Sequence, residues 1–195
     1  MCSIFGIFGL QPGDDIQALR RQSLDCSQRQ RHRGPDWSGV YIDEGGASEG
    51  AILVHERLAI VDPAGGSQPL LSEDRGLALA VNGEIYNHKQ LKAELTQAYA
   101  FQTESDCEVI NALYLEDAPA SFLNRLNGIF AFALWDAGKG RAIIARDPLG
   151  VCPLYWGHDK EGRLRVASEM KSLVDDCADV AQFPPGHWYD TATGE

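Results

Sequence analysis

The amino-acid sequence predicts an α+β fold in which mostly antiparallel sheets carry helices on their outer faces. Segments rich in β-forming residues are grouped towards the two ends of the chain, and segments with helical periodicity are grouped between them. Strands that do not alternate one for one with helices favour antiparallel sheets over a doubly wound parallel sheet. With 195 residues, 44% of them hydrophobic, the chain is long enough for one packed domain that spans residues 1–195.

The N-terminal part of the chain is predicted to hold a buried strand, a helix and three short strands. Residues 3–10 are apolar and end at the turn residues Gln11-Pro12-Gly13. Asp14 is the expected N-cap of a helix that runs towards Arg31 and packs on a sheet. Short strands are predicted at residues 39–42, 51–57 and 77–82. The loop Gly65-Gly66-Ser67 matches no phosphate-binding pattern and is expected to be flexible.

Helical periodicity returns after Asn87 and gives way to strands again after Gly128. Leu91, Leu95 and Ala98 share one predicted helix face, a second helix begins at Ser105-Asp106, and a third helical piece covers residues 119–126. Residues 182–195 lose periodicity and are expected to form the exit from a domain. Further strands are predicted at residues 129–135, 141–146, 151–156 and 163–167.

Charge and cysteine count limit the classes of partner. Lys and Arg total 17 against 28 Asp and Glu, and the net charge of −11 argues against nucleic acid and against an anionic membrane surface. The apolar stretch 3–10 is too short to be a signal peptide or a membrane anchor. The cysteines have no CxxC spacing and the histidines do not cluster, so we expect reduced thiols in a cytoplasmic protein, with no metal site.

Cys2 is a candidate nucleophile because of its position. Removal of Met1 would leave one residue with both a thiol and a free α-amine. The amine has a pKa of roughly 7.7–8.0, so its neutral form is available to accept the thiol proton and no separate histidine is needed. The alternative is a small buried residue at the start of a strand, and position alone favours that alternative.

Two further segments have both a functional and a structural explanation. Arg57 ends an apolar strand, where its guanidinium either clamps an α-carboxylate or pairs with Glu56 or Asp62 on the surface. Asn82 and Gly83 close the strand that precedes them. They form a hairpin turn, an oxyanion hole built from the Asn amide and the Gly backbone N–H, or both.

Two carboxylates complete the pattern of an amino-acid site. As structural residues, Asp106 begins a helix and Glu84 is solvated. If both instead face Cys2 and Arg57, they supply the negative charge that an α-ammonium group requires. The predicted substrate class is then an amino acid.

Taken together, these residues resemble the class II glutamine amidotransferase domain of the N-terminal nucleophile hydrolases. Within that family the chain is similar to the N-terminal half of the glutamine-hydrolysing asparagine synthetases, and the likeness covers nearly the whole chain. It rests on several motifs in a fixed order: Met1-Cys2-Ser3-Ile4-Phe5-Gly6, Arg31-His32-Arg33-Gly34-Pro35-Asp36, His55-Glu56-Arg57-Leu58, Val81-Asn82-Gly83-Glu84-Ile85-Tyr86-Asn87, Ser105-Asp106-Cys107-Glu108, Phe130-Ala131-Phe132-Ala133, Ala145-Arg146-Asp147-Pro148-Leu149-Gly150 and Ala167-Ser168-Glu169-Met170-Lys171.

The resemblance implies a four-layer αββα sandwich of two mostly antiparallel sheets, the N-terminal nucleophile hydrolase fold. It implies that Cys2 is the nucleophile and that Asn82 with Gly83 holds the oxyanion. Arg33 would either gate the release of ammonia or brace the site. The residues implied to bind glutamine are Arg57 for its carboxylate, Glu84 and Asp106 for its α-ammonium group, Asn82 and Gly83 for its amide oxygen, and the main chain of Leu58, Ala59, Ile60 and Val61.

The implied function is hydrolysis of L-glutamine to glutamate and ammonia. The ammonia would serve ATP-dependent synthesis of asparagine from aspartate in a synthetase domain that uses ATP and Mg²⁺. This chain has no SGGxDS pyrophosphate loop, so that domain is expected to act in cis or in trans from outside it, and no cofactor is expected here. Two alternatives stay open: a non-catalytic or regulatory binding module that retains Met1, and the glutaminase domain of another class II amidotransferase that feeds ammonia to a sugar phosphate. A homodimer also stays open.

Overall fold

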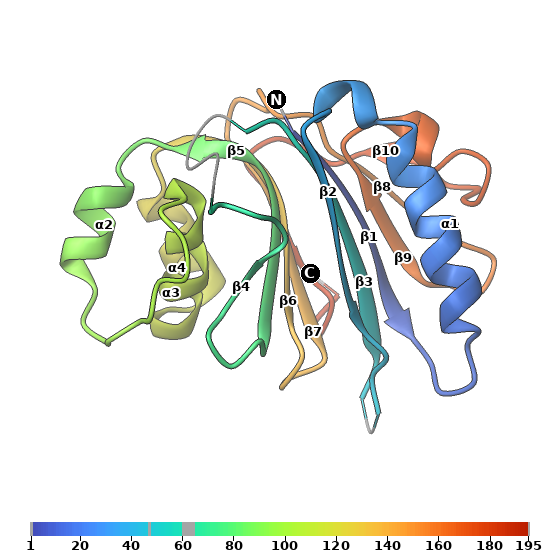
Figure 1. The fold of residues 1–195 in the computed structure, drawn as a ribbon, viewed down its shortest axis with the longest axis horizontal. Coiled ribbons are helices and arrows are strands. Elements are labelled where there is room, and N and C mark those ends of the chain that lie inside the picture. Colours follow the sequence, from blue (N-terminus) through green and yellow to red (C-terminus); the bar gives the residue numbers. More distant parts are fainter. Residues whose placement is uncertain (1, 47, 60–64, 195) are drawn as a thin grey trace.

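The polypeptide folds into four layers, with two β-sheets packed face to face between two layers of helices (Figure 1). The structure is a computed structural model and describes residues 2–46, 48–59 and 65–194. Helix α1 (Ile16–Gln28) covers the outer face of one sheet, and α2 (His88–Glu94), α3 (Val109–Glu116) and α4 (Pro119–Phe122) cover the outer face of the other. The predicted αββα arrangement is therefore confirmed.

The first sheet, sheet A, contains the N-terminal strand at an inner position. Its strands follow the order β10-β8-β9-β1-β3-β2, and each neighbouring pair is antiparallel. Its members are β1 (Ser3–Leu10), β2 (Trp37–Asp43), β3 (Gly50–Arg57), β8 (Tyr155–His158), β9 (Leu164–Ala167) and β10 (Ala181–Gln182).

The second sheet, sheet B, has the order β11-β7-β6-β5-β4 and is also antiparallel throughout its described pairs. Its members are β4 (Leu70–Leu71), β5 (Leu77–Ile85), β6 (Gly128–Asp136), β7 (Arg141–Arg146) and β11 (Trp188–Asp190). Short 3₁₀ turns connect the layers: η1 (Arg31–Arg33), η2 (Asp106–Glu108), η3 (Leu123–Arg125) and η4 (Met170–Ser172).

Side-chain size alternates along the central strands of sheet B and explains the layering. The face towards sheet A is lined by small residues such as Ala80 and Ala133, which let the large Phe8 of β1 pack closely against Trp135. The opposite face carries Phe132 and other large residues, which pack under the helices. Successive side chains of a strand point to opposite faces, so one strand contributes to both apolar layers.

The hairpin-turn interpretation of Asn82 and Gly83 is wrong. Strand β5 continues through both residues to Ile85 and pairs with β6 along this length. A Cβ atom on Gly83 would collide with the backbone carbonyl of Ile129. Glycine is therefore required here by the close approach of two strands, and not by a turn.

The first helix begins one residue later than predicted. Asp15, and not Asp14, is the N-cap, because its carboxylate accepts a hydrogen bond of 2.9 Å from the Ala18 N–H. Asp14 instead accepts one of 2.9 Å from the Gln11 N–H and closes the preceding turn. The helix ends at Gln28, and the turn η1 replaces the last predicted helical turn.

Two predicted elements between residues 87 and 156 are too long. Helix α2 ends at Glu94, because Leu95 adopts an extended backbone with ψ of 132°. The predicted strand 151–156 begins only at Tyr155. Before it, the Asp147 carboxylate binds the backbone N–H groups of Val151 and Cys152 at 3.1 and 3.2 Å, and so holds a turn in place of a strand.

The C-terminal stretch that lacks periodicity is part of the fold. Strand β11 pairs with β7 at the edge of sheet B, and the Arg141 guanidinium forms an ion pair with the buried Asp190. A three-residue strand is too short for its pattern to be visible in sequence, so tertiary pairing decides it.

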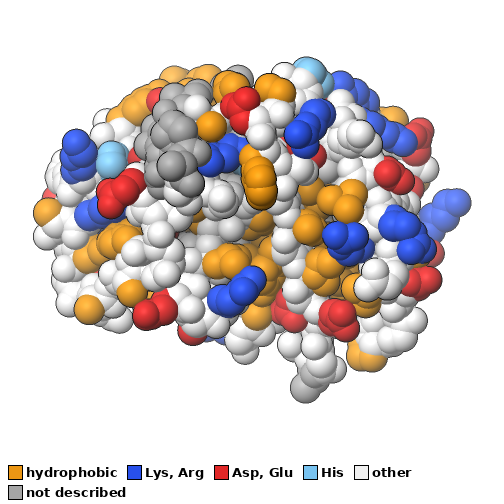
Figure 2. Space-filling model, viewed as in Figure 1, with side chains coloured by type: hydrophobic (Ala, Val, Ile, Leu, Met, Phe, Trp, Pro, Cys, Tyr) orange, Lys and Arg blue, Asp and Glu red, His pale blue; other side chains and the backbone are white. Residues whose placement is uncertain are grey.

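None of the helices in the described part of the chain has the length and apolarity needed to cross a bilayer. On the face shown in Figure 2, acidic and basic side chains are interspersed.

Candidate active site

The predicted site residues meet at one end of the two sheets. Strands β1 and β3 are antiparallel, with Ser3 opposite Glu56, so the start of β1 lies beside the end of β3. This register brings Cys2, which precedes β1, next to Leu58, which follows β3. The end of β5 comes from the facing sheet and closes the site.

The Cys2 thiol is half-buried and forms hydrogen bonds with the backbone of one residue, Leu58. Its Sγ accepts a hydrogen bond of 3.3 Å from the Leu58 N–H and lies 3.6 Å from the Leu58 carbonyl oxygen, to which it donates. Burial raises the pKa of the Cys2 thiol, and the Leu58 hydrogen bond and the positive charge of Arg57 only partly oppose this. The group is therefore a neutral thiol near pH 7 and needs a base to become a nucleophile.

The backbone of Cys2 is braced from the turn η1. Arg33 Nε donates to the Cys2 carbonyl oxygen at 3.1 Å, and its Nη1 lies 3.2 Å from the Glu169 carboxylate. Glu169 is itself fixed, because its N–H donates to Gln30 Oε1 at 2.9 Å. Of the two alternatives for Arg33, these contacts support the bracing role.

Asn82 lies next to Cys2 and keeps an unused amide. The residue is completely buried, and neither atom of its side-chain amide has a hydrogen-bond partner among the described residues. A buried amide without a partner is costly, so its retention points to a ligand that completes it.

The backbone N–H of Gly83 is directed away from β6. The Val81 N–H donates to Gln68 Oε1 at 2.9 Å, and the Ile85 N–H donates to Asp106 Oδ2 at 2.6 Å, so both point away from β6. Alternate N–H groups of a strand point to the same edge. The Gly83 N–H therefore points between Gln68 and Asp106, into the space that these residues enclose.

Arg57 and Glu56 are neighbours on β3 but face different surroundings. The Glu56 carboxylate accepts hydrogen bonds from Ser27 and from Arg31 at 2.9 and 3.0 Å, beneath α1. Arg57 is 6% exposed and lines the space beside Cys2. The structure therefore pairs Glu56 with Arg31; Asp62, the other suggested partner of Arg57, lies outside the described residues.

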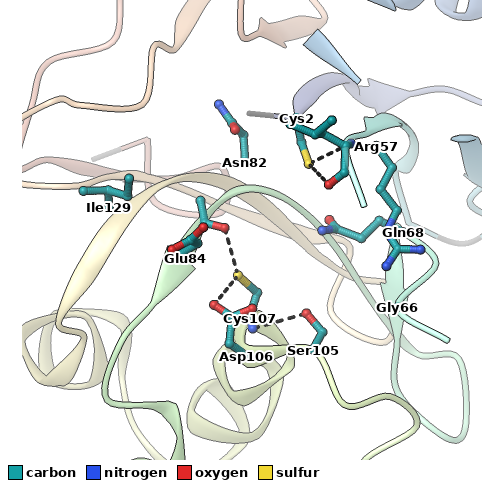
Figure 3. A pocket seen from close by; sticks show the side chains of 12 residues that line it. Cys2, Arg57, Gly66, Gln68, Asn82, Glu84, Ser105, Asp106, Cys107 and Ile129 are labelled. Atoms are coloured by element: carbon teal, nitrogen blue, oxygen red, sulfur yellow. Dashed lines mark hydrogen bonds between the residues drawn. The ribbon is translucent and has the colours of Figure 1, made fainter. Parts of the chain in front are cut away.

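A cavity of about 570 Å³, open to solvent, joins these groups (Figure 3). Ala59 is not among the lining residues, and its N–H donates to the Asp36 carboxylate at 2.9 Å; Ile60 and Val61 lie outside the described residues. The predicted residues that line the cavity are Cys2, Arg57, Leu58, Asn82, Gly83, Glu84 and Asp106.

The sequence assigned no role in the site to the other residues that line the cavity. Gly66 belongs to the loop Gly65-Gly66-Ser67, which is predicted to be flexible, and Gln68 follows that loop shortly before β4. Cys107 donates a hydrogen bond of 3.6 Å to the Gly83 carbonyl oxygen, and burial raises the pKa of its thiol well above the ordinary value. The remaining lining residues are Ser105 and Ile129.

The site contains both charge signs and a donor pair, which together suit a zwitterionic amino acid. Glu84 and Asp106 lie on one side of the cavity and Arg57 on the other, and Cys2 and Asn82 lie along its upper edge (Figure 3). Chemically, the arrangement offers a thiol, the Asn82 amide and the Gly83 N–H as donors for an oxyanion, and opposite charges for an α-ammonium and an α-carboxylate group.

Comparison with known proteins agrees with this geometry. The family model described as glutamine amidotransferase domain matches residues 1–189. The chain is 53% identical over 195 residues to asparagine synthetase B [glutamine-hydrolyzing] of Escherichia coli (strain K12), covering 100% of this chain and 34% of the relative. It is 47% identical over 194 residues to asparagine synthetase [glutamine-hydrolyzing] 2 of Oryza sativa subsp. japonica, covering 100% of this chain and 31% of the relative. The chain thus spans about a third of the length of these curated relatives.

Solved structures share the same fold. The glutamine phosphoribosylpyrophosphate amidotransferase from B. subtilis superposes with a TM-score of 0.74 at 24% identity, over 97% of this chain and 47% of that chain. A structure titled as the allosteric regulatory enzyme of purine biosynthesis gives 0.72 at 27% identity, over 97% and 46%. The fold is the N-terminal nucleophile hydrolase fold that the resemblance implied. Because the family model spans nearly the entire sequence, the chain belongs to the glutamine amidotransferase domain family.

Proposed function

We propose that this chain hydrolyses L-glutamine to L-glutamate and ammonia, with the Cys2 thiol as nucleophile. The observation that carries the proposal is the buried Asn82 amide, which has no hydrogen-bond partner among the described residues and lies in one cavity with a thiol and the Gly83 N–H. This combination supports attack on a carbonyl group followed by stabilisation of an oxyanion.

The first half of the reaction forms a thioester. After removal of Met1, the α-amine of Cys2 takes the thiol proton, and the sulfur attacks the side-chain amide carbon of glutamine. The negative charge on the amide oxygen is held by Asn82 and Gly83. The protonated amine then gives its proton to the leaving ammonia, and a γ-glutamyl thioester remains on Cys2.

The second half of the reaction releases glutamate. The α-amine accepts a proton from water as the water oxygen attacks the thioester carbon in front of the same two oxyanion donors. The C–S bond then breaks, glutamate leaves, and the protonated amine returns its proton to the Cys2 sulfur. Burial raises the pKa of the Cys2 thiol, and this supports the need for a base. Leu58 holds the sulfur in place through both steps.

The charged side chains orient the substrate. Arg57 takes its α-carboxylate, while Glu84 and Asp106 take its α-ammonium group. The main chain of Leu58, Ala59, Ile60 and Val61 forms a further part of the proposed glutamine site. No cofactor or metal is required by these steps.

The ammonia is proposed to be used for ATP-dependent synthesis of asparagine from aspartate. Support comes from relatives that are named glutamine-hydrolyzing asparagine synthetases and are about three times as long as this chain. A synthetase domain in cis, with its ATP and Mg²⁺, would supply that second reaction. A reducing compartment such as the cytoplasm is part of the proposal because Cys2 must stay a thiol, and the five cysteines form no disulfide among the described residues.

An electrophilic glutamine analogue tests the nucleophile directly. The protein is incubated with 6-diazo-5-oxo-L-norleucine, and the modified peptide and the N-terminal residue are identified by mass spectrometry. We expect one label on Cys2 of molecules that have lost Met1, and no glutaminase activity in Cys2→Ala. The matched control is Cys107→Ala, since Cys107 lines the same cavity. Labelling of Cys107, or normal turnover in molecules that retain Met1, would contradict the proposal.

A further inference from the structure

We propose that Gln68 is a substrate-binding residue of this site and that its side-chain NH₂ group donates a hydrogen bond to the substrate α-carboxylate beside Arg57. The inference rests on the proposed glutaminase function, because it concerns the carboxylate end of the same substrate. The supporting observation is that contacts within the fold fix both the backbone and the side-chain amide of Gln68.

The backbone of Gln68 rests on sheet A. A Cβ atom on Gly39 of β2 would overlap the carbonyl oxygen of Gln68, so the two backbones are in direct contact. The side chain of Gln68 reaches across to sheet B, where Oε1 accepts a hydrogen bond of 2.9 Å from the Val81 N–H of β5. Gln68 therefore bridges the two sheets where the cavity opens.

The bond to Val81 decides which end of the amide is available to a ligand. A glutamine amide has one acceptor oxygen and an NH₂ group that carries two donors. The oxygen is engaged by Val81, and the residue lines the cavity, so the NH₂ end is presented to the cavity. In Figure 3 the amide of Gln68 extends into the space between Cys2 and Cys107.

The distribution of charge indicates which substrate group this donor meets. The two acidic side chains, Glu84 and Asp106, lie on one side of the cavity, and Gln68 lies on the opposite side together with Arg57 (Figure 3). An α-amino acid carries its ammonium and carboxylate groups on one carbon atom, so the carboxylate is turned towards Arg57 when the acids hold the ammonium. A second donor at that position suits a carboxylate.

Other substrate atoms are less suited to Gln68. The side-chain amide oxygen of glutamine already has two donors in the proposal, the Asn82 amide and the Gly83 N–H. A carboxylate has about four acceptor positions, which is more than one guanidinium fork occupies. The α-carboxylate is therefore the acceptor that remains for the NH₂ group of Gln68.

Gln68→Glu separates substrate binding from structural support. The variant keeps an oxygen that accepts the Val81 N–H but replaces the NH₂ donor with a negatively charged acceptor. We expect the KM for L-glutamine to rise about 10- to 100-fold, as for the loss of one hydrogen bond to a charged group, with little change in kcat. With L-glutamine α-amide, which has a carboxamide in place of the α-carboxylate, we expect variant and wild type to have similar kcat/KM values.

The comparison of the two substrates removes indirect effects. Any influence of the new carboxylate on the Cys2 thiol is common to both substrates and cancels in the ratio of their kcat/KM values. Gln68→Met, which is neutral and similar in length, is the second variant, and it should also lower the preference for L-glutamine over the α-amide. Thermal unfolding of both variants reports whether loss of the Val81 bond has disturbed the fold.

The outcomes separate this inference from the proposed function. An unchanged ratio in both variants, or an equal loss of kcat/KM with both substrates, would overturn the role of Gln68. If the wild-type protein does not hydrolyse glutamine, the proposed function fails. Calorimetric binding of L-glutamine and its α-amide to wild type and Gln68→Glu then tests Gln68 by itself, with a selective loss of L-glutamine binding expected and equal binding counting against the role.

Discussion

The Asp106 carboxylate accepts a hydrogen bond of 2.6 Å from the backbone N–H of Ile85, so the first residue of η2 is tied to the last residue of β5. Ile85 is two residues after Gly83 on the same strand, a separation of about 6.6 Å. This contact therefore fixes a negative charge beside the cavity, two residues along the strand from the Gly83 oxyanion donor.

Asp106→Asn should weaken glutamine binding without unfolding the protein. The amide oxygen of the new residue is still able to accept the Ile85 N–H, but the charge that faces the α-ammonium group is lost. We expect the KM for L-glutamine to rise about 10- to 100-fold with the melting temperature nearly unchanged. Asp106→Ala is the comparison, since it also loses the Ile85 bond and should unfold at a lower temperature. Steady-state kinetics and thermal unfolding measure both effects, and an unchanged KM in Asp106→Asn would contradict the assignment.

Asn82→Ala should lower turnover but not stability. Loss of one oxyanion donor lowers kcat by about 100- to 1000-fold. The Asn82 amide has no hydrogen-bond partner among the described residues, so its removal breaks no bond of the fold. The control is the buried Asn111, which donates to the Leu70 carbonyl oxygen at 3.3 Å. Asn111→Ala should cost about 1 kcal/mol of unfolding free energy and leave kcat unchanged, and the reverse pattern would place the oxyanion donor elsewhere.

Gly83→Ala should destabilise the protein through its backbone neighbour. A Cβ atom at this position would meet the Ile129 carbonyl oxygen, and the two strands would have to separate. We expect a loss of about 1–3 kcal/mol in the free energy of unfolding, together with loss of glutaminase activity. Gly46→Ala is the matched control, because a Cβ atom there meets nothing within 4 Å. Urea unfolding of both variants measures the difference, and equal stability would show that β5 and β6 tolerate the added methyl group.

Stability should fall as the pH drops through the titration of His55. Burial lowers the pKa of His55 to about 4, and its Nε2 donates to the Val81 carbonyl oxygen at 2.9 Å. The unfolded chain has a histidine pKa near 6.5, so between these values the unfolded state binds more protons. The contribution of His55 to the free energy of unfolding is therefore fully present above about pH 6.5. It is lost as the pH falls towards 4, and the total loss is about 3 kcal/mol.

His55→Gln removes this titration and keeps a donor for the Val81 carbonyl. Urea unfolding at pH 4.5 and pH 7.5 should show a smaller loss of stability in the variant than in wild type. Parallel losses in the two proteins would mean that other groups control the acid sensitivity.

The sequence predicted the boundaries of regular elements best where a long apolar run ends at a turn. The first strand, residues 3–10, and the seventh, residues 141–146, match the structure at both ends. The N-cap was displaced by one residue because two adjacent aspartates have the same propensity, and only the direction of the incoming chain distinguishes Asp14 from Asp15. The short edge strand β11 was not predicted, because its stability comes from pairing with β7.

The residue types of the site were visible in the sequence, but their assembly was not. Seven predicted residues line one cavity, as the motif resemblance implied. Gln68 was missed because its proposed role depends on contacts with Gly39 and Val81. Gly39 lies in sheet A and Val81 in sheet B, and both are distant from Gln68 in the chain. A residue in a glycine-containing loop carries no local sign of such contacts.

By itself, the sequence determined the layers and the chemical groups. The grouping of helical segments between strand segments predicted an α+β fold with antiparallel sheets, and the motif resemblance implied the four layers and the groups of the site. The tertiary structure alone decided that Asn82 and Gly83 lie inside a strand, that the Gly83 N–H faces the cavity, and that the Gln68 amide presents its donor end. The physical reason is that the direction of a hydrogen bond depends on strand register and on the packing of one sheet against the other, and neither is encoded in any single segment.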